Sequence, residues 1–437
     1  MREACGRPDP PRAGWTRAGI ALAVGLVALL VYQSNDNHVR TGDTFPARVL
    51  PISIIEEGDL DFNEFRGVAR GGRPLEEGYM FNRVGERVLS YYSIVPGLLN
   101  LPTHLIARQM GYDIRVEVQV LGRITAGVVA ALSVFFMTFT LLSVCERTGV
   151  AVMFGALFAF GTTTWSVAAT GLWQHGPSLM FLGAAFAGLC LKRRAGILIA
   201  GFMLGMAVWN RLPNAAYAAG VTVYLALYRP RELPWLIGGA VPPALAMFGY
   251  SWTHWGSIWA LGEGHQVTLF SGPLLHNLAA TLVSPNRGFF VFSPVFLLAL
   301  PTLYHVLRTP RRWPLLFALS LGSLAILLAH SLWLFWWGGD QFGYRLLTEM
   351  VPVWILLLAL AWERWISKSR AGIAVFATLA TLSVYINFLG GVYYPSGWNA
   401  TPVSVNDHPE RAWDYRDTEI GRLHRIFLEG EQAGSVR

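Results

Sequence analysis

The sequence predicts an all-α, multi-pass membrane protein with about 11 transmembrane helices and a long first outer loop containing interfacial helices. Of its 437 residues, 53% are hydrophobic and only 14% are charged, whereas soluble domains carry about 25% charged residues. Charged residues gather between apolar stretches that approach the roughly 20 residues a bilayer core requires. The expected spans are 18–32, 119–143, 150–166, 173–191, 195–210, 212–228, 233–251, 288–307, 314–334, 346–362 and 371–389.

The first span follows several arginines, and a secretory signal peptide begins with the same pattern. No clear small-residue cleavage site follows residue 32, so we expect an uncleaved first helix. The arginines are Arg2, Arg7, Arg12 and Arg17.

Basic residues between the spans predict the orientation, because cytoplasmic loops carry an excess of Lys and Arg. The basic groups fall at alternate ends of the spans if segment 93–109 is a helix in the outer interface and does not cross. The N-terminus is then cytoplasmic and the C-terminus extracytoplasmic. The inner groups are Arg147, Lys192 to Arg194, Arg229 with Arg231, Arg308 with Arg311 and Arg312, and Arg364 with Lys368 and Arg370.

We expect residues 1–437 to form one integral membrane domain with two long outer regions, the loop 33–118 and the tail 390–437. The net charge of +7 and the pI near 9.4 are also typical of nucleic-acid binding. The predicted orientation instead places the Lys and Arg excess on the inner face, so no nucleic-acid partner is needed. Three cysteines, two of them in apolar stretches, argue against a disulfide framework or a zinc site.

The first outer loop opens with an acid. Asp43 lies about ten residues past the first span, after Gly42, which allows a turn, and before Pro46, which restrains the chain. A carboxylate held at a membrane surface can act as a general base or orient a cation; a solvated loop aspartate is the alternative. Asp59 and Asp61 form a DxD pair, which we interpret as a solvated acidic turn.

Basic and aromatic residues recur where the outer loops meet the spans. Arg87 precedes two tyrosines and could bind a lipid phosphate or serve as an interfacial anchor. Trp173, Gln174 and His175 cluster at a predicted helix N-terminus, which favours anions, although a lone histidine is more often structural. Arg211 lies at the outer boundary, where it can snorkel or bind an anion.

The densest cluster follows the ninth span, where Trp336, Trp337, Asp340 and Arg345 stand among glycines. Paired tryptophans suit a sugar platform, because the CH faces of sugars pack on aromatic rings, and arginine binds phosphate through two parallel hydrogen bonds. An aromatic belt explains the tryptophans equally well, but it does not explain the acid and the arginine. Arg287, at the start of the eighth span, is a further candidate for phosphate.

Six segments carry a resemblance to known proteins. They are TGDTFPARVLPISIIEEGDLDFNEF, NRVGERVLSYYSIVPGLLNLP, GLWQHGPSLMFL, NRLPN, SPNRGFFVFSPVF and WWGGDQFGYRLLTEMVP. Together they resemble a group of bacterial multi-pass proteins of the C-type glycosyltransferase superfamily, near the protein O-mannosyltransferases and the lipid A aminoarabinose transferases. The likeness covers most of the chain and rests on layout: a first helix, a long outer loop opening with an acid, interfacial helices and then a helical array.

The resemblance implies a glycosyltransferase of the bacterial cytoplasmic membrane, with a polyprenyl-phosphate-linked sugar as donor and a glycan, lipid or protein as acceptor. Asp43 matches the early acid that acts on the acceptor. A second acid often lies in the family's second outer loop, where this chain has Gln174 and His175, so His175 is the expected second catalytic residue. Some members need a divalent metal, and one acid with one histidine leaves metal dependence open. The expected donor-phosphate ligands are Arg87, Arg211, Arg287 and Arg345, and the expected sugar or acceptor contacts are Trp173, Gln174, Trp336, Trp337 and Asp340.

Two other functions stay open. A lipid or sugar transporter or flippase would carry ionisable groups at mid-membrane, whereas the predicted spans are nearly free of charge in their middles, with His330 the residue to check. A non-catalytic envelope-assembly protein would tolerate the loss of Asp43. The transferase hypothesis also makes a positional prediction, that one outward-facing cavity is lined by Asp43, His175, Arg211, Arg287, Trp336 and Arg345.

Overall fold

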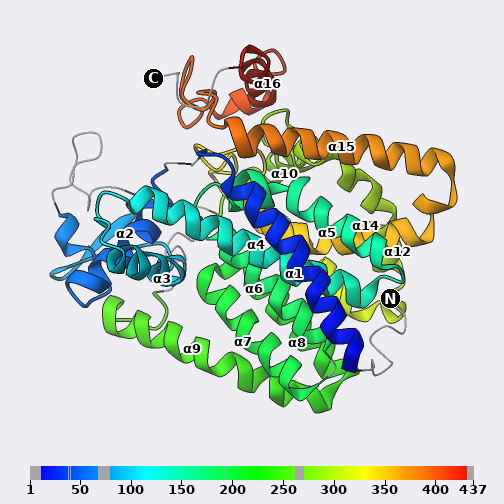
Figure 1. Cartoon of the computed structure of the whole chain (residues 1–437), viewed down its shortest axis with the longest axis horizontal. Helices are drawn as coiled ribbons and strands as arrows, with labels where there is room; N and C mark the ends of the chain where they lie inside the picture. Colours follow the sequence, from blue (N-terminus) through cyan, green and yellow to red (C-terminus); the bar gives the residue numbers. More distant parts are fainter. Residues whose placement is uncertain are drawn as a thin grey trace.

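The structure is a computed structural model that describes residues 11–37, 39, 41–66, 79–191, 193–260 and 270–430. These residues are mainly helical, as Figure 1 shows. Expectations that involve Arg2, Cys5, Arg7 and Lys192 lie outside the described residues.

Six helical segments in the described part of the chain are long and apolar enough to cross a membrane, by length and composition. They indicate a membrane protein, while the count of eleven spans remains a prediction. The six are α1 (Pro11–Gln33), α4 (Val118–Val144), α9 (Leu233–Trp255), α13 (Pro314–Leu332), α14 (Val351–Arg364) with its flanking turns, and α15 (Arg370–Tyr393).

The other predicted spans correspond to shorter or interrupted helices. The span expected at 288–307 is divided into α11 (Phe289–Phe292), a 3-10 helix (Pro294–Ala299) and α12 (Leu300–Arg308), because the Pro294 ring removes a backbone N–H from the helical ladder. The remaining short helices are α5 (Thr148–Phe160), followed by a π-helical turn (Thr164–Ala168), α6 (His175–Cys190), α7 (Arg194–Asn210), and α8 (Ala215–Tyr228), which follows a 3-10 turn (Leu212–Asn214).

Three elements differ from the sequence prediction. An antiparallel hairpin joins β1 (Phe81–Val84) to β2 (Arg87–Ser90), so the chain is not purely α-helical. Its two-residue turn holds Gly85 at φ +62°, a backbone conformation that glycine adopts without steric cost. The helices α10 (Leu274–Val283) and α16 (Glu419–Glu429) lie in segments that we expected to be loop and tail.

The loop between α1 and α4 has its own small core. A helix at 93–109 is confirmed as α3 (Val95–Gln109), and it packs on α2 (Phe45–Glu56) and on the hairpin. Figure 1 places α2 and α3 together at one side of the helical array. The side chains that fill this core include Val49, Leu50, Ile52, Phe62, Phe81, Val88 and Ile94.

A large apolar core joins the long helices, with α1 packed on α4, α4 on α6, α6 on α7 and α7 on α9. Two irregular segments lie at the end of this array where α1 finishes and α4 begins. The first runs between α13 and α14 and contains the WWGGDQFGYR sequence and a 3-10 helix (Arg345–Met350). The second is the described part of the tail after α15, residues 394–430, which ends in α16 and packs Trp398, Val405 and Ala412 against Trp336 and Trp337.

Candidate functional site

Asp43 lies in the turn just before α2 and is held by three side chains from distant segments. Its Oδ2 accepts a hydrogen bond of 2.7 Å from Arg345, and its Oδ1 accepts from the hydroxyls of Tyr79 (2.7 Å) and Tyr92 (3.0 Å). The Asp43 side chain remains 19% exposed, whereas Arg345 is buried. The carboxylate is therefore held by a fixed cation and two hydroxyls and remains partly exposed.

Arg345 is fixed by the segment on which it lies. Its Nε donates to Gln341 Oε1 (2.7 Å), and its second terminal nitrogen donates to the carbonyl of Gly338 (2.7 Å). The Trp173 ring supports the guanidinium, with 4.0 Å between Cζ and the ring centroid, a cation–π distance. The structure therefore brings Asp43, Arg345 and Trp173 together, and Arg345 occupies one face of the ring of Trp173, a residue that was predicted to contact the sugar or acceptor.

The glycines beside Arg345 have a physical explanation. Gly338 has φ +71°, and a Cβ there would lie 2.5 Å from the Gln341 amide nitrogen. This turn directs the Gly338 carbonyl to Arg345 and the next carbonyl, of Gly339, to Arg287 at 3.2 Å. The sequence pattern GGD thus positions two arginines.

Gly338→Ala is expected to lower the free energy of unfolding by about 1–2 kcal/mol, because an L-residue at positive φ is strained and because Gln341 must shift. Chemical unfolding of the purified protein measures the change. Gly249→Ala in α9 is the matched control, because nothing lies within 4 Å of its Cβ position and alanine favours a helix. Equal stability of Gly338→Ala and wild type would contradict the role assigned to this turn.

A second polar cluster is buried four residues further along the same segment. The Glu349 carboxylate is fully buried and accepts from His175 Nδ1 and from Arg211, both at 2.9 Å. The second terminal nitrogen of Arg211 lies 3.0 Å from His330 Nε2, and His330 Nδ1 lies 2.9 Å from the Ile326 carbonyl. Since a guanidinium can only donate, His330 accepts at Nε2 and donates at Nδ1.

Glu349 was not among the residues that the sequence singled out. The sequence offered one acid and one histidine, whereas the structure pairs His175 with a second acid from a segment 174 positions away. The sequence did contain a signal for Glu349, because an ionisable residue inside an expected membrane span is by itself a candidate functional residue. Glu349 lies within the expected span 346–362.

Arg287 does not fit its predicted role as a phosphate ligand. Its guanidinium is buried and donates to the carbonyls of Trp337, Asn286 and Gly339 and to the side chains of Asn399 and Glu419. These five bonds match the five N–H donors that a guanidinium has. Arg287 therefore joins the tail to the loop that carries Arg345, and we correct the prediction accordingly.

The predicted sugar platform is also corrected. Trp336 and Trp337 are buried against the tail, and the Trp337 indole donates to Asn406. Asp340 is exposed and accepts from the same Asn406. Arg87 lies on the hairpin and donates to the Thr253 carbonyl of α9, and it makes no hydrogen bond or ion pair with another predicted site residue among the described ones. These four residues are not assembled around Asp43.

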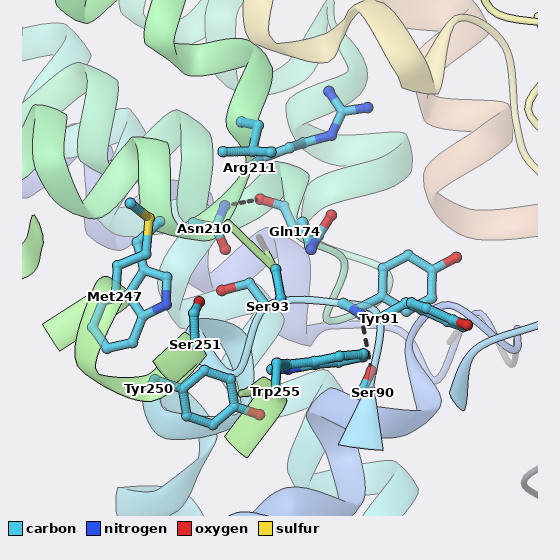
Figure 2. Close-up of a pocket in the computed structure, with 14 residues that line it drawn as sticks. Ser90, Tyr91, Ser93, Gln174, Asn210, Arg211, Met247, Tyr250, Ser251 and Trp255 are labelled. Atoms are coloured by element: carbon cyan, nitrogen blue, oxygen red, sulfur yellow. Dashed lines mark hydrogen bonds between the residues drawn. The ribbon is translucent and has the colours of Figure 1, made fainter. Parts of the chain in front are cut away.

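A pocket lies beside the two polar clusters, between the hairpin, the start of α6, and the ends of α7 and α9 (Figure 2). Tyr92 lines it and also binds Asp43. Gln174 and Arg211, both predicted as site residues, line it too, whereas Trp336 and Arg287 do not. Of the six residues predicted to line one cavity, only Arg211 lines this pocket, and Asp43, His175, Arg287, Trp336 and Arg345 are not among its lining residues.

The electrostatics of Asp43 favour its ionised form. Burial alone would raise the pKa of the carboxyl, but the charge of Arg345 and the hydrogen bonds from Tyr79, Arg345 and Tyr92 outweigh burial and lower the pKa below its ordinary value. A base with a lowered pKa is weaker but stays deprotonated through the neutral range.

Tyr92→Phe is expected to move the acidic limb of the activity profile to higher pH. It removes a hydrogen bond to the ionised carboxylate, so the pKa of Asp43 rises and protonation abolishes activity at a higher pH. The kcat/KM of the sugar transfer expected from the sequence, measured from pH 3 to 8, gives the shift. Tyr415→Phe, at an exposed tail residue, should leave the profile unchanged; an unchanged Tyr92→Phe profile would exclude Asp43 as the titrating group.

Among the described residues, no group of three or more His, Cys, Asp or Glu side chains is placed to hold a metal ion. No protein-family model matches the chain, and no curated protein matches it.

Proposed function

We propose that this protein is a glycosyltransferase that moves a sugar from a polyprenyl-phosphate donor to an acceptor on the outer face of the cytoplasmic membrane. The observation that supports it most is the Asp43 carboxylate, which is partly exposed and fixed between a buried arginine and two tyrosine hydroxyls. This geometry suits a base that must face a substrate hydroxyl while its orientation is held.

In the proposed reaction, the acceptor oxygen forms a bond to the anomeric carbon of the donor as the bond from that carbon to the phosphate oxygen breaks. The acceptor proton passes to Asp43, and the electron pair of the broken bond stays on the lipid phosphate. Direct displacement inverts the anomeric centre. Arg345 would stabilise the phosphate charge, because a guanidinium has five N–H donors and its hydrogen bonds to Gln341, Asp43 and Gly338 use three of them.

The buried cluster has a supporting role in this proposal. Glu349 orients His175 through Nδ1, as a carboxylate orients the histidine of a hydrolase triad. His175 then presents Nε2 as the nitrogen that can accept or return a proton. Arg211 balances the Glu349 charge inside the helical array.

One observation favours a second candidate, a transporter. Glu349, Arg211, His175 and His330 are buried together among apolar helices, and ionisable groups in such positions often mark ion or substrate paths. The sequence interpretation that the helices are nearly free of charge missed this cluster.

A reconstituted assay separates the candidates. Purified full-length protein in vesicles receives a radiolabelled polyprenyl-phosphate sugar, with envelope glycans, lipids or proteins as acceptors. Label on an acceptor supports the transferase. Movement of the labelled lipid between leaflets without transfer supports the transporter, and the absence of both overturns both proposals.

A further inference from the structure

The pocket beside Asp43 combines features that point to one class of ligand. It is lined by aromatic side chains, by hydroxyls and by two amides, and its empty space is about 520 Å³ with the solvent at its mouth included. Its aromatic side is formed by Tyr91 and Trp255, whose ring centroids lie 5.7 Å apart.

The polar side of the pocket offers an acceptor that the protein does not use. The side-chain oxygen of Asn210 is buried and accepts no hydrogen bond from the described part of the chain. The amide nitrogen of the same side chain is fixed by the Gln174 carbonyl (2.6 Å) and the Ser178 hydroxyl (2.8 Å). Figure 2 shows the Asn210 oxygen turned toward Ser93 and Ser251, so a fixed acceptor faces a hydroxyl-bearing wall. An acceptor buried in this way is costly unless a ligand or water donates to it.

The pocket has no charged group facing it among its described lining residues. Arg211 is the one charged residue there, and its guanidinium points away from the pocket, as Figure 2 shows, to bind Glu349 and His330. A phosphate would find no cation at this place, and an aliphatic chain would leave the Asn210 oxygen without a donor.

We propose that this pocket binds a neutral sugar ring, with one CH face on Trp255 and its hydroxyls on Asn210, Ser93 and Ser251. A sugar ring presents an apolar face and a rim of donors, which is the combination that the two sides of the pocket complement. The identity of this sugar rests on the proposed function. Tyr92 lines the pocket and donates a hydrogen bond to Asp43, the proposed base for the acceptor. The sugar ring in the pocket therefore belongs to the acceptor, and the acceptor is a glycan.

The test is equilibrium binding without any donor. The full-length protein in lipid nanodiscs, free of sugar-headed detergent, is titrated with methyl glycosides of glucose, mannose, galactose and arabinose, and binding is followed by saturation-transfer NMR. At least one glycoside should bind, and Trp255→Leu and Ser251→Ala should each weaken it about tenfold, the loss of roughly 1.4 kcal/mol. The matched control is Trp252→Leu, on the same helix but exposed and outside the pocket, which should bind as wild type does.

Two competitors distinguish the other occupants. Displacement of the glycoside by inorganic phosphate, or binding of decanol in preference to every glycoside, would overturn the assignment, as would equal glycoside binding by wild type and both pocket variants. Sugar transfer to an acceptor without glycoside binding would refute the pocket assignment alone. Glycoside binding without any transfer would refute the proposed reaction and leave the pocket as a carbohydrate site.

Discussion

Asp43→Asn is expected to lower the rate of sugar transfer by roughly 10²–10⁴-fold, the usual contribution of a general base. The amide keeps the size of the side chain and an oxygen for the tyrosine hydroxyls, but it cannot take the acceptor proton. The loss should appear in kcat, because an interaction with the reacting proton matters most in the transition state. The measurement is the initial rate of label transfer from the polyprenyl-phosphate sugar at saturating acceptor.

The control for this variant is Asp407→Asn, an exposed tail aspartate, which should transfer sugar at the wild-type rate. Because Asp43→Asn leaves the buried Arg345 charge without its carboxylate, its folding is checked by chemical unfolding. If that variant unfolds, the double variant Asp43→Asn with Arg345→Gln removes both charges. The transfer rate of this double variant then tests the role of the Asp43 carboxylate. A folded Asp43→Asn protein with full transfer activity would contradict the proposed mechanism.

Glu349→Gln is expected to reduce the free energy of unfolding by about 3–5 kcal/mol, because it leaves Arg211 as an uncompensated charge in the helical core. The carboxylate is fully buried and binds both Arg211 and His175, so its loss leaves both of them without this partner. Chemical unfolding followed by tryptophan fluorescence measures the loss.

A double-mutant cycle identifies the cause of that loss. Glu349→Met together with Arg211→Met removes both charges, and the double variant should be more stable than Glu349→Gln, since replacing a buried pair by apolar side chains is often close to neutral. Glu86→Gln, at a pair on the protein surface, should change stability by no more than about 0.5 kcal/mol. If the losses in the free energy of unfolding caused by substitution of Arg211 and of Glu349 are additive, the two charges do not stabilise each other.

The long helices and the helix at 93–109 could be predicted because each is encoded by one continuous, mainly apolar stretch of the sequence. Asp43 and Arg345 could both be proposed, but their 2.7 Å contact could not, because it joins positions 302 apart. Trp336, Trp337 and Arg287 were placed wrongly for one physical reason. The tail covers them, and nothing in its polar composition marks it as a segment that packs on a core. The hairpin was missed although Gly85 stands between two short β-prone runs.

The hydrogen bonds between Arg287 and the tail can form only after the tail has been synthesised. The loop that carries Arg345 is held by Asn399 and Glu419, which the ribosome adds after all of the long helices. A nascent chain that has inserted α15 still has Arg287 without these partners and Trp336 uncovered. The site around Asp43 is therefore completed last, and the proposed sugar transfer would begin only after the whole chain has been made.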